Sequence, residues 1–242
     1  MIKNDLHVHS IQSLCGLHTL LEIVEIAAGK GMRLVNISDH GSAAGKKMNF
    51  GVLTDKRRRP EKISSSGGKI ISVLAGIEAN ILDIDGNSDF PREMAGKFDL
   101  VSAGFHHPIG QSADDNTTAL ENYLAQYPLD ILTHPCIATF PQNLERVVAL
   151  SLEHGFAMEV NNTNLRVEKT NVTQLEQLIH LARESGAILV ENSDGHTFFE
   201  IGENDRVEAL LKRLQIDGDE IFINRDDLRL DQFLAHRKKM RI

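Results

Sequence analysis

The sequence predicts an α/β protein built as a parallel barrel of about seven strands. Seven short apolar segments alternate along the chain with longer segments whose apolar residues recur every three or four positions. That order is typical of parallel strands covered by helices. The length of 242 residues suits a barrel better than an open sheet. No expected strand is followed by a Gly-x-Gly-x-x-Gly or P-loop sequence, which disfavours a nucleotide-binding open sheet. We expect one domain spanning residues 1–242.

The expected elements follow from these patterns in chain order. Strands are expected at residues 2–9, 34–40, 71–81, 99–107, 130–135, 156–162 and 187–196, and helices near residues 19–31, 116–127, 142–154, 171–185 and 204–214. Gly31 and Gly155 follow two of the helical patterns, and we expect them to end those helices. The polar stretch 41–68 is long for a loop, so we expect an active-site loop that contains some helix or is partly mobile.

The composition narrows the classes of protein. Hydrophobic residues make up 41% of the chain, enough for a full core, and the formal net charge of −8 disfavours a nucleic-acid-binding surface. Cys15 and Cys136 are too few for a disulfide framework. The sequence shows neither an apolar leader nor an apolar run of membrane-spanning length. We therefore expect a soluble, cytoplasmic protein with no membrane partner.

The segment DLHVHS, residues 5–10, places two histidines two positions apart. On a strand, His7 and His9 would project from the same face and could bind one metal ion. On their own they fit a pair of surface histidines on an edge strand equally well. Polar residues of the same kinds also stand at the ends of the other expected strands, namely Asp39, His40, Glu78, His106, His107, His134, Asp194 and His196. Because the carboxyl ends of parallel strands meet on one face of a barrel, we expect a metal site there.

Six motifs follow one another along the chain: DLHVHS, ISDHG, GIEAN, AGFHHP, LTHP and NSDGHT. In this order they resemble the PHP family, the polymerase and histidinol phosphatase domain, and most closely its single-domain bacterial phosphoesterases. The resemblance covers nearly the whole chain. It implies a distorted (β/α)7 barrel, similar to a TIM barrel, with two or three divalent metal ions, zinc or manganese before iron. It also implies hydrolysis of a small phosphorylated substrate.

The resemblance implies a set of metal ligands, residue by residue. The ligands form three groups: His7, His9, Glu78 and Asp194 at one metal; Glu78, His106 and His134 at a second; and His40 and His196 at a third. Relatives of this type carry a histidine at the position of Cys15, where a thiolate suits zinc better than manganese. Cys15 is the expected remaining ligand of the third metal. His18, at the start of the first expected helix, is the alternative.

For phosphoester hydrolysis, such a di- or trinuclear centre implies a metal-bound hydroxide as the nucleophile, with no covalent protein nucleophile. Asp39 and His107 are candidates for the general acid by position alone. Arg58 and Arg59 belong to a basic run in the long stretch before the third expected strand. They could bind a phosphate group, or the run could be a solvated charge cluster.

Two other functions stay open at this point. A metal-dependent amidohydrolase is also a barrel that begins with His-x-His. That class usually bridges its metals with a lysine on a middle strand, and the segment DLVSAGF contains none. A metal-binding regulatory protein with a decayed site is the non-enzymatic alternative, because Cys15 departs from the expected pattern.

Overall fold

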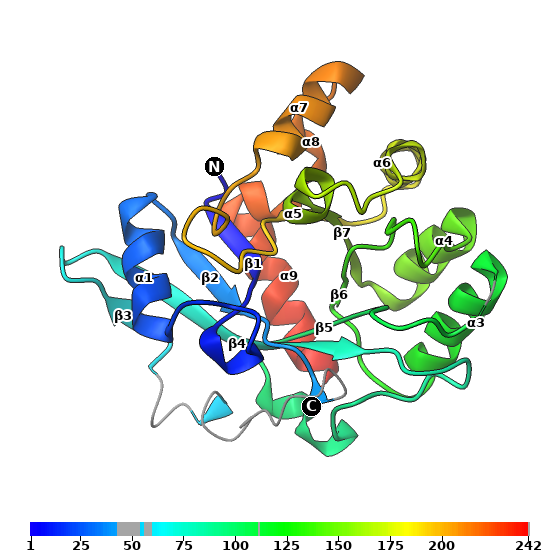
Figure 1. Cartoon of the computed structure of the whole chain (residues 1–242), viewed down its shortest axis with the longest axis horizontal. Helices are drawn as coiled ribbons and strands as arrows, with labels where there is room; N and C mark the ends of the chain where they lie inside the picture. Colours follow the sequence, from blue (N-terminus) through cyan, green and yellow to red (C-terminus); the bar gives the residue numbers. More distant parts are fainter. Residues whose placement is uncertain (43–53, 56–59, 111, 242) are drawn as a thin grey trace.

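The computed structural model describes residues 1–42, 54–55, 60–110 and 112–241. Within these residues, seven parallel strands follow one another in chain order around a nearly closed barrel (Figure 1). The strands of the barrel are β1 (Asn4–Val8), β2 (Leu34–Ile37), β4 (Ile70–Asn80), β5 (Leu100–Gly104), β6 (Ile131–Leu132), β7 (Ala157–Asn161) and β8 (Leu189–Asn192). The predicted parallel barrel of about seven strands is confirmed.

The barrel closes where the chain beyond β8 returns to β1. Val8 and Gly195 form a parallel bridge, and the backbone N–H of His9 donates to the carbonyl oxygen of Gly195 at 3.0 Å. The pairing of β1 with β2 shifts register between Asp5 and Val8. As a result Leu6 packs inside the barrel, while Val8 packs against the first helix. A regular strand would have placed these two side chains on the same face.

Helices cover the outside of the barrel. They are α1 (Leu20–Gly29), α3 (Ala113–Leu124), α4 (Leu144–His154), α5 (Asn162–Arg166), α6 (Val172–Ser185), α7 (Asp205–Leu214), α8 (Gly218–Ile221) and α9 (Asp227–Met240). In Figure 1, α1 lies on one side of the barrel and α3, α4 and α6 lie on the other. Gly155 caps α4 with φ 69°, and Gly31, with φ 80°, follows the end of α1, so both predicted helix ends are confirmed.

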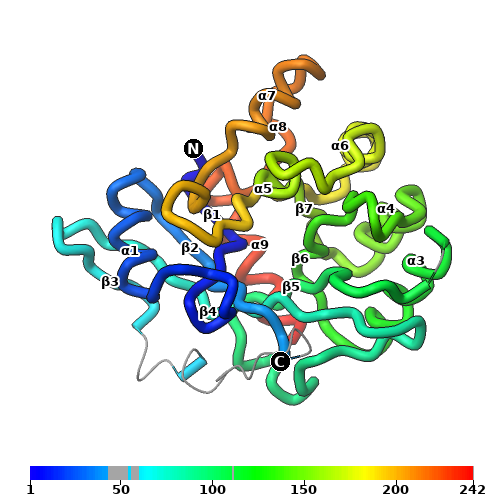
Figure 2. Tube along the Cα trace, in the orientation of Figure 1, coloured from blue at the N-terminus to red at the C-terminus, as the bar shows by residue number. Residues whose placement is uncertain are grey.

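The amino-terminal end of the barrel is closed by α9, a helix that the sequence patterns did not predict. Leu230 and Phe233 of α9 pack in one apolar cluster with the first residues of several strands, among them Leu34, Leu100 and Ile131. Figure 2 shows this C-terminal helix crossing behind the strands. The helix forms a floor under the barrel, opposite the carboxyl ends of the strands. No helix in the described ranges is both long and apolar enough to cross a membrane.

The stretch 41–68, expected as an active-site loop, lies only in part within the described residues, so that expectation stays a prediction. Its residues 62–64 form a short strand, β3 (Lys62–Ser64), which pairs antiparallel with the beginning of β4, Lys62 opposite Ser72. Strand β4 is long because its residues 72–75 pair with β2 and its residues 76–80 pair with β5, while the hairpin adds Ile70 and Ile71. Arg58 and Arg59 fall outside the described residues, so their predicted phosphate contact stays a prediction.

Candidate metal centre

The predicted ligand residues converge at the carboxyl ends of the strands. Strands β1 and β4 supply His7, the adjoining His9 and Glu78, and the loop after β1 supplies Cys15. The segments after β2, β5, β6 and β8 supply His40, His106, His134, Asp194 and His196. Among the described residues, three overlapping groups of these side chains place their donor atoms within 4.8 Å of one another.

Glu78 stands at the middle of the cluster. Its Oε1 lies 2.9 Å from His134 Nε2 and 3.3 Å from His106 Nε2, while its Oε2 lies 2.9 Å from His40 Nδ1 and 3.3 Å from His7 Nε2. Burial alone would raise the pKa of Glu78, but the surrounding imidazoles hold that pKa well below its usual range. A buried carboxylate whose two oxygens face separate sets of histidines has the geometry of a ligand that bridges two cations.

His7, His9 and Asp194 form the second feature of the cluster. The two Nε2 atoms are 3.1 Å apart, and Asp194 Oδ1 lies 3.2 Å from His9 Nε2 and 3.5 Å from His7 Nε2. All three side chains are almost completely buried. Burial lowers the pKa of His9 to about 3, so its ring is neutral. Electron-pair donors packed this closely fit a cation between them, and imidazole and carboxylate are ligands of zinc, manganese and iron.

Cys15 joins His9, His40 and His196 in a third group of donor atoms. Because Gly16 has no side chain, this loop can approach the end of β1 closely. A Cβ atom at Gly16 would lie only 2.5 Å from the backbone carbonyl oxygens of His9 and Ser10. Burial raises the pKa of Cys15, but hydrogen bonds with His196 and His40 outweigh burial and lower it to about 5. The same thiolate counters the effect of burial on His196 and raises its pKa to about 9. The described residues thus offer a sulfur and three imidazoles at one position.

His18, the alternative to Cys15, lies apart from these groups. Its ring faces Phe198 edge-on with the centroids 6.3 Å apart, and its Nε2 is buried without a hydrogen bond to any described residue. Among the described residues, Cys15 and not His18 lies within ligand distance of His40 and His196.

Two of the converging residues have an unusual backbone conformation. His134 has φ 36° and Asp194 has φ 53°. Both values lie in the left-handed region of backbone conformation, which residues other than glycine seldom adopt. Such strain persists only where neighbouring groups hold it. Asn161 Nδ2 donates to Asp194 Oδ2 at 3.1 Å, and the backbone N–H of His134 donates to Glu159 Oε2 at 2.9 Å.

Glu159 and Ser13 are residues of the centre that the sequence patterns missed. Glu159 lies inside the barrel on β7 and contacts His7 Nδ1 at 2.7 Å. Ser13 Oγ accepts from the backbone N–H of His40 at 2.8 Å and lies 3.2 Å from His9 Nδ1. A signal for Glu159 was present, because residues two apart on a strand share a face and Asn161 ends the same strand.

The two positional candidates for the general acid differ in surroundings. Asp39 is fully buried, and both of its oxygens accept hydrogen bonds at 2.6 Å, from the backbone N–H and the hydroxyl of Ser10. These contacts make Asp39 a structural tie between β1 and β2. His107 is exposed.

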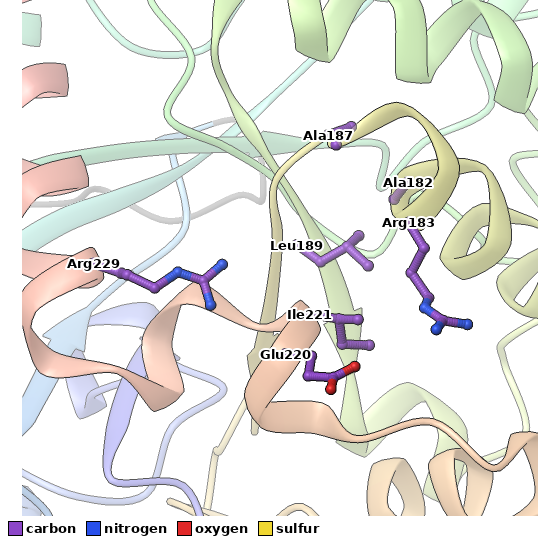
Figure 3. A pocket seen from close by; sticks show the side chains of 8 residues that line it. Ala182, Arg183, Ala187, Leu189, Glu220, Ile221 and Arg229 are labelled. Atoms are coloured by element: carbon purple, nitrogen blue, oxygen red, sulfur yellow. The ribbon is translucent and has the colours of Figure 1, made fainter.

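A separate cavity of about 280 Å³ lies at the opposite end of β8, between the end of α6 and the α8–α9 region (Figure 3). Arg183, Glu220 and Arg229 are the charged side chains of its lining. None of the predicted site residues lines this cavity, so it is distinct from the His and carboxylate cluster.

Barrel and cluster together define a protein of the metal-dependent hydrolase class, with its donor atoms at the carboxyl ends of parallel strands. A probable phosphatase of Shewanella sp. strain MR-4 is 32% identical to the chain over 236 residues, which are 96% of this chain and 91% of that protein. The chain belongs to the same family of enzymes as this probable phosphatase. No protein-family model matches the chain.

Solved structures share the fold at low sequence identity. A histidinol phosphate phosphatase from Lactococcus lactis, in complex with zinc, L-histidinol and phosphate, aligns with TM-score 0.56 and 12% identity and covers 89% of this chain and 94% of its own. A chain of archaeal ribonuclease P with mature tRNA aligns equally well, with TM-score 0.56 and 12% identity over 98% of this chain and 90% of that one. The fold alone therefore does not decide the function.

Proposed function

We propose that the chain is a PHP-type metal-dependent phosphatase that hydrolyses small phosphomonoesters. The observation that carries the proposal is the position of Glu78. One of its oxygens faces His106 and His134 and the other faces His7 and His40. A carboxylate of this kind can bridge the two cations of a dinuclear site for phosphate hydrolysis.

The remaining donors complete the proposed centre. His7, His9 and Asp194 would bind a cation on one side of Glu78, and His106 and His134 would bind a second cation on the other side. Cys15, His40 and His196 would bind a third. Bound divalent cations would supply the positive charge that holds phosphate oxygens and activates water for attack.

The relatives support a phosphomonoester as the substrate. The family includes the probable phosphatase of Shewanella, and the barrel of the histidinol phosphate phosphatase carries zinc and phosphate in its structure. The net charge of −8 weighs against a polyanionic nucleic acid as the main substrate. A small phosphomonoester is the substrate class that fits these observations together.

Turnover of p-nitrophenyl phosphate by the purified full chain tests the proposal. We expect hydrolysis that requires added zinc or manganese and stops after chelation. A carboxyl ester or an amide with the same chromophore should not be hydrolysed, because the centre is proposed to act on tetrahedral phosphorus. Metal-dependent amide hydrolysis without phosphatase activity would favour an amidohydrolase and overturn the proposal. A panel of sugar phosphates, nucleotides and histidinol phosphate would then rank the substrates by kcat/KM.

A further inference from the structure

Strand β7 contributes no residue to the three donor groups found among the described residues, although its neighbours β6 and β8 are each followed by residues of the cluster. What β7 supplies instead is Glu159, which is 1% exposed and lies beside Val190 of β8 in the sheet.

Four donors from four parts of the barrel converge on the Glu159 carboxylate. Oε1 contacts His7 Nδ1 at 2.7 Å and accepts from Asn192 Nδ2 at 2.8 Å. Oε2 accepts from the backbone N–H of His134 at 2.9 Å and from Asn161 Nδ2 at 3.0 Å. A carboxylate has about four lone-pair positions, so these four contacts saturate it.

The orientation of both asparagine amides is fixed independently of Glu159. Asn192 Oδ1 accepts from the backbone N–H of Leu6 at 2.9 Å, and Asn161 Oδ1 accepts from the backbone N–H of Asn164 at 2.9 Å. Because each amide oxygen already faces a backbone donor, each amide nitrogen must face Glu159. With the His134 N–H, three N–H groups donate to Glu159 and favour its ionised form. An ionised carboxylate can only accept, so the hydrogen in its contact with His7 belongs to the imidazole.

This direction of hydrogen bonding determines which nitrogen carries the hydrogen when His7 is a neutral ligand. A neutral imidazole with its hydrogen on Nδ1 has its lone pair on Nε2, and Nε2 is the atom that lies near His9, Glu78 and Asp194. An imidazole with its hydrogen on Nε2 would instead direct a donor at the place where a cation should bind. A carboxylate behind a ligand histidine commonly fixes the tautomer and the ring orientation in this way.

The same carboxylate also holds the second half of the cluster. The backbone N–H of His134 is bound to Glu159, and His134 has the strained φ of 36° while its Nε2 lies 2.9 Å from Glu78 Oε1. Glu159 therefore connects His7, on one side of Glu78, with His134, on the other.

We propose that Glu159 is the positioning residue of the metal centre: through one carboxylate it fixes the Nδ1–H tautomer of His7 and the backbone of His134. This inference rests on the proposed function only in taking His7 and His134 as metal ligands. Glu159 is not a catalytic residue, since it reaches the centre through these two residues.

Zinc affinity of the full chain, measured by competition with a chelator, tests the proposal. In the Glu159→Gln variant, one carboxylate oxygen becomes an NH₂ group that faces N–H donors where the wild type has an acceptor. We therefore expect this variant to bind zinc about 10–100-fold more weakly than the wild type. The matched control is Glu191→Gln. Glu191 is an equally buried carboxylate on β8, but it pairs with Arg225 instead of a histidine of the centre. Unchanged zinc affinity in Glu159→Gln, or an equal loss in both variants, would overturn the proposal.

A second measurement needs no substitution of Glu159. In the zinc-loaded wild-type chain labelled with ¹⁵N at histidine, the His7 signals are those lost in His7→Gln. We expect His7 to carry a hydrogen on Nδ1 and none on Nε2, whereas a hydrogen on Nε2 beside a bare Nδ1 would overturn the proposal even if Glu159→Gln does not fold. Both measurements are made without substrate. A chain that binds zinc in the expected way yet hydrolyses no phosphomonoester would therefore refute the proposed function and leave the role of Glu159 standing.

Discussion

Arg237 in the last helix donates from Nε to Asp130 Oδ1 at 3.0 Å, and both side chains are buried beneath the barrel. Arg237 also donates to the carbonyl oxygens of Leu129 and His154, and Arg241 donates to the other oxygen of Asp130. Asp130 stands just before β6, so this ion pair attaches α9 to the amino-terminal end of the strands. The floor of the barrel thus depends on a buried charge pair as well as on apolar contacts.

We expect Arg237→Ala to lower the free energy of unfolding by about 3–5 kcal/mol, because it removes one of the two guanidinium partners of the buried Asp130 and the donor to two carbonyl oxygens. Chemical denaturation of the metal-free chain measures the loss. The control is Lys238→Ala, one residue further along α9, where the side chain is 51% exposed and the change should stay within about 0.5 kcal/mol. Equal stability of the two variants would mean that the pair does not hold the helix.

Arg237 also explains why α9 could not be predicted from its sequence. The buried stripe of α9 consists of Leu230, Phe233 and Arg237, three and four residues apart. A charged residue at a core position breaks the apolar periodicity by which the other long helices were recognised. Its partner, Asp130, is more than a hundred residues away in the sequence. Only the folded chain brings this compensating charge to the helix.

The strands and the cluster were more accessible to prediction because their signals are local. A parallel strand buried on both faces is a short apolar run, and the residue that ends it lies at the carboxyl end of the barrel. This reasoning located Glu78 and Asp194 at the cluster. The register shift in β1 and the role of Glu159 depend on contacts between distant strands, and the sequence of one strand does not contain them.

Replacing Asp194 by Asn should abolish phosphatase activity and leave the chain folded. The change removes the charge of an oxygen that lies 3.2 Å from His9 Nε2. Asparagine readily adopts the left-handed conformation, so the backbone at φ 53° should not be disturbed. Turnover of p-nitrophenyl phosphate at saturating metal, with circular dichroism to check folding, measures the effect. Asp85→Asn, in an exposed turn, is the control and should keep full activity. Near-normal turnover in Asp194→Asn would contradict its assignment to the centre.

Alkylation should distinguish the two cysteines of the metal-free chain. Hydrogen bonds with His196 and His40 overcome the effect of burial and lower the pKa of Cys15 to about 5. Cys15 is therefore a thiolate at pH 7, and its rate of reaction with iodoacetamide should fall by half only when the pH drops to about 5. Burial raises the pKa of Cys136 to about 12, so Cys136 should stay unmodified until the chain unfolds. Mass spectrometry of the modified peptides measures both rates.

Saturating zinc provides the matched comparison for this experiment. A thiolate that binds a cation is protected from alkylation, so Cys15 should react slowly in the zinc-loaded chain and quickly after chelation. Equal rates with and without zinc would show that Cys15 does not contact the metal. If the rate of Cys15 alkylation in the metal-free chain already falls to half of its maximum near pH 9, the imidazoles do not stabilise the thiolate.

The number of bound metal ions should depend on Cys15 and not on His18. Cys15 lies in a donor group with His40 and His196, whereas His18 packs its ring against Phe198. We expect elemental analysis to find one metal equivalent fewer in Cys15→Ala than in the wild type, and an unchanged count in His18→Ala. Cys15→His should restore the lost equivalent and shift the preference from zinc toward manganese, since imidazole is a less zinc-selective ligand than thiolate. A count that falls only in His18→Ala would make His18 the ligand.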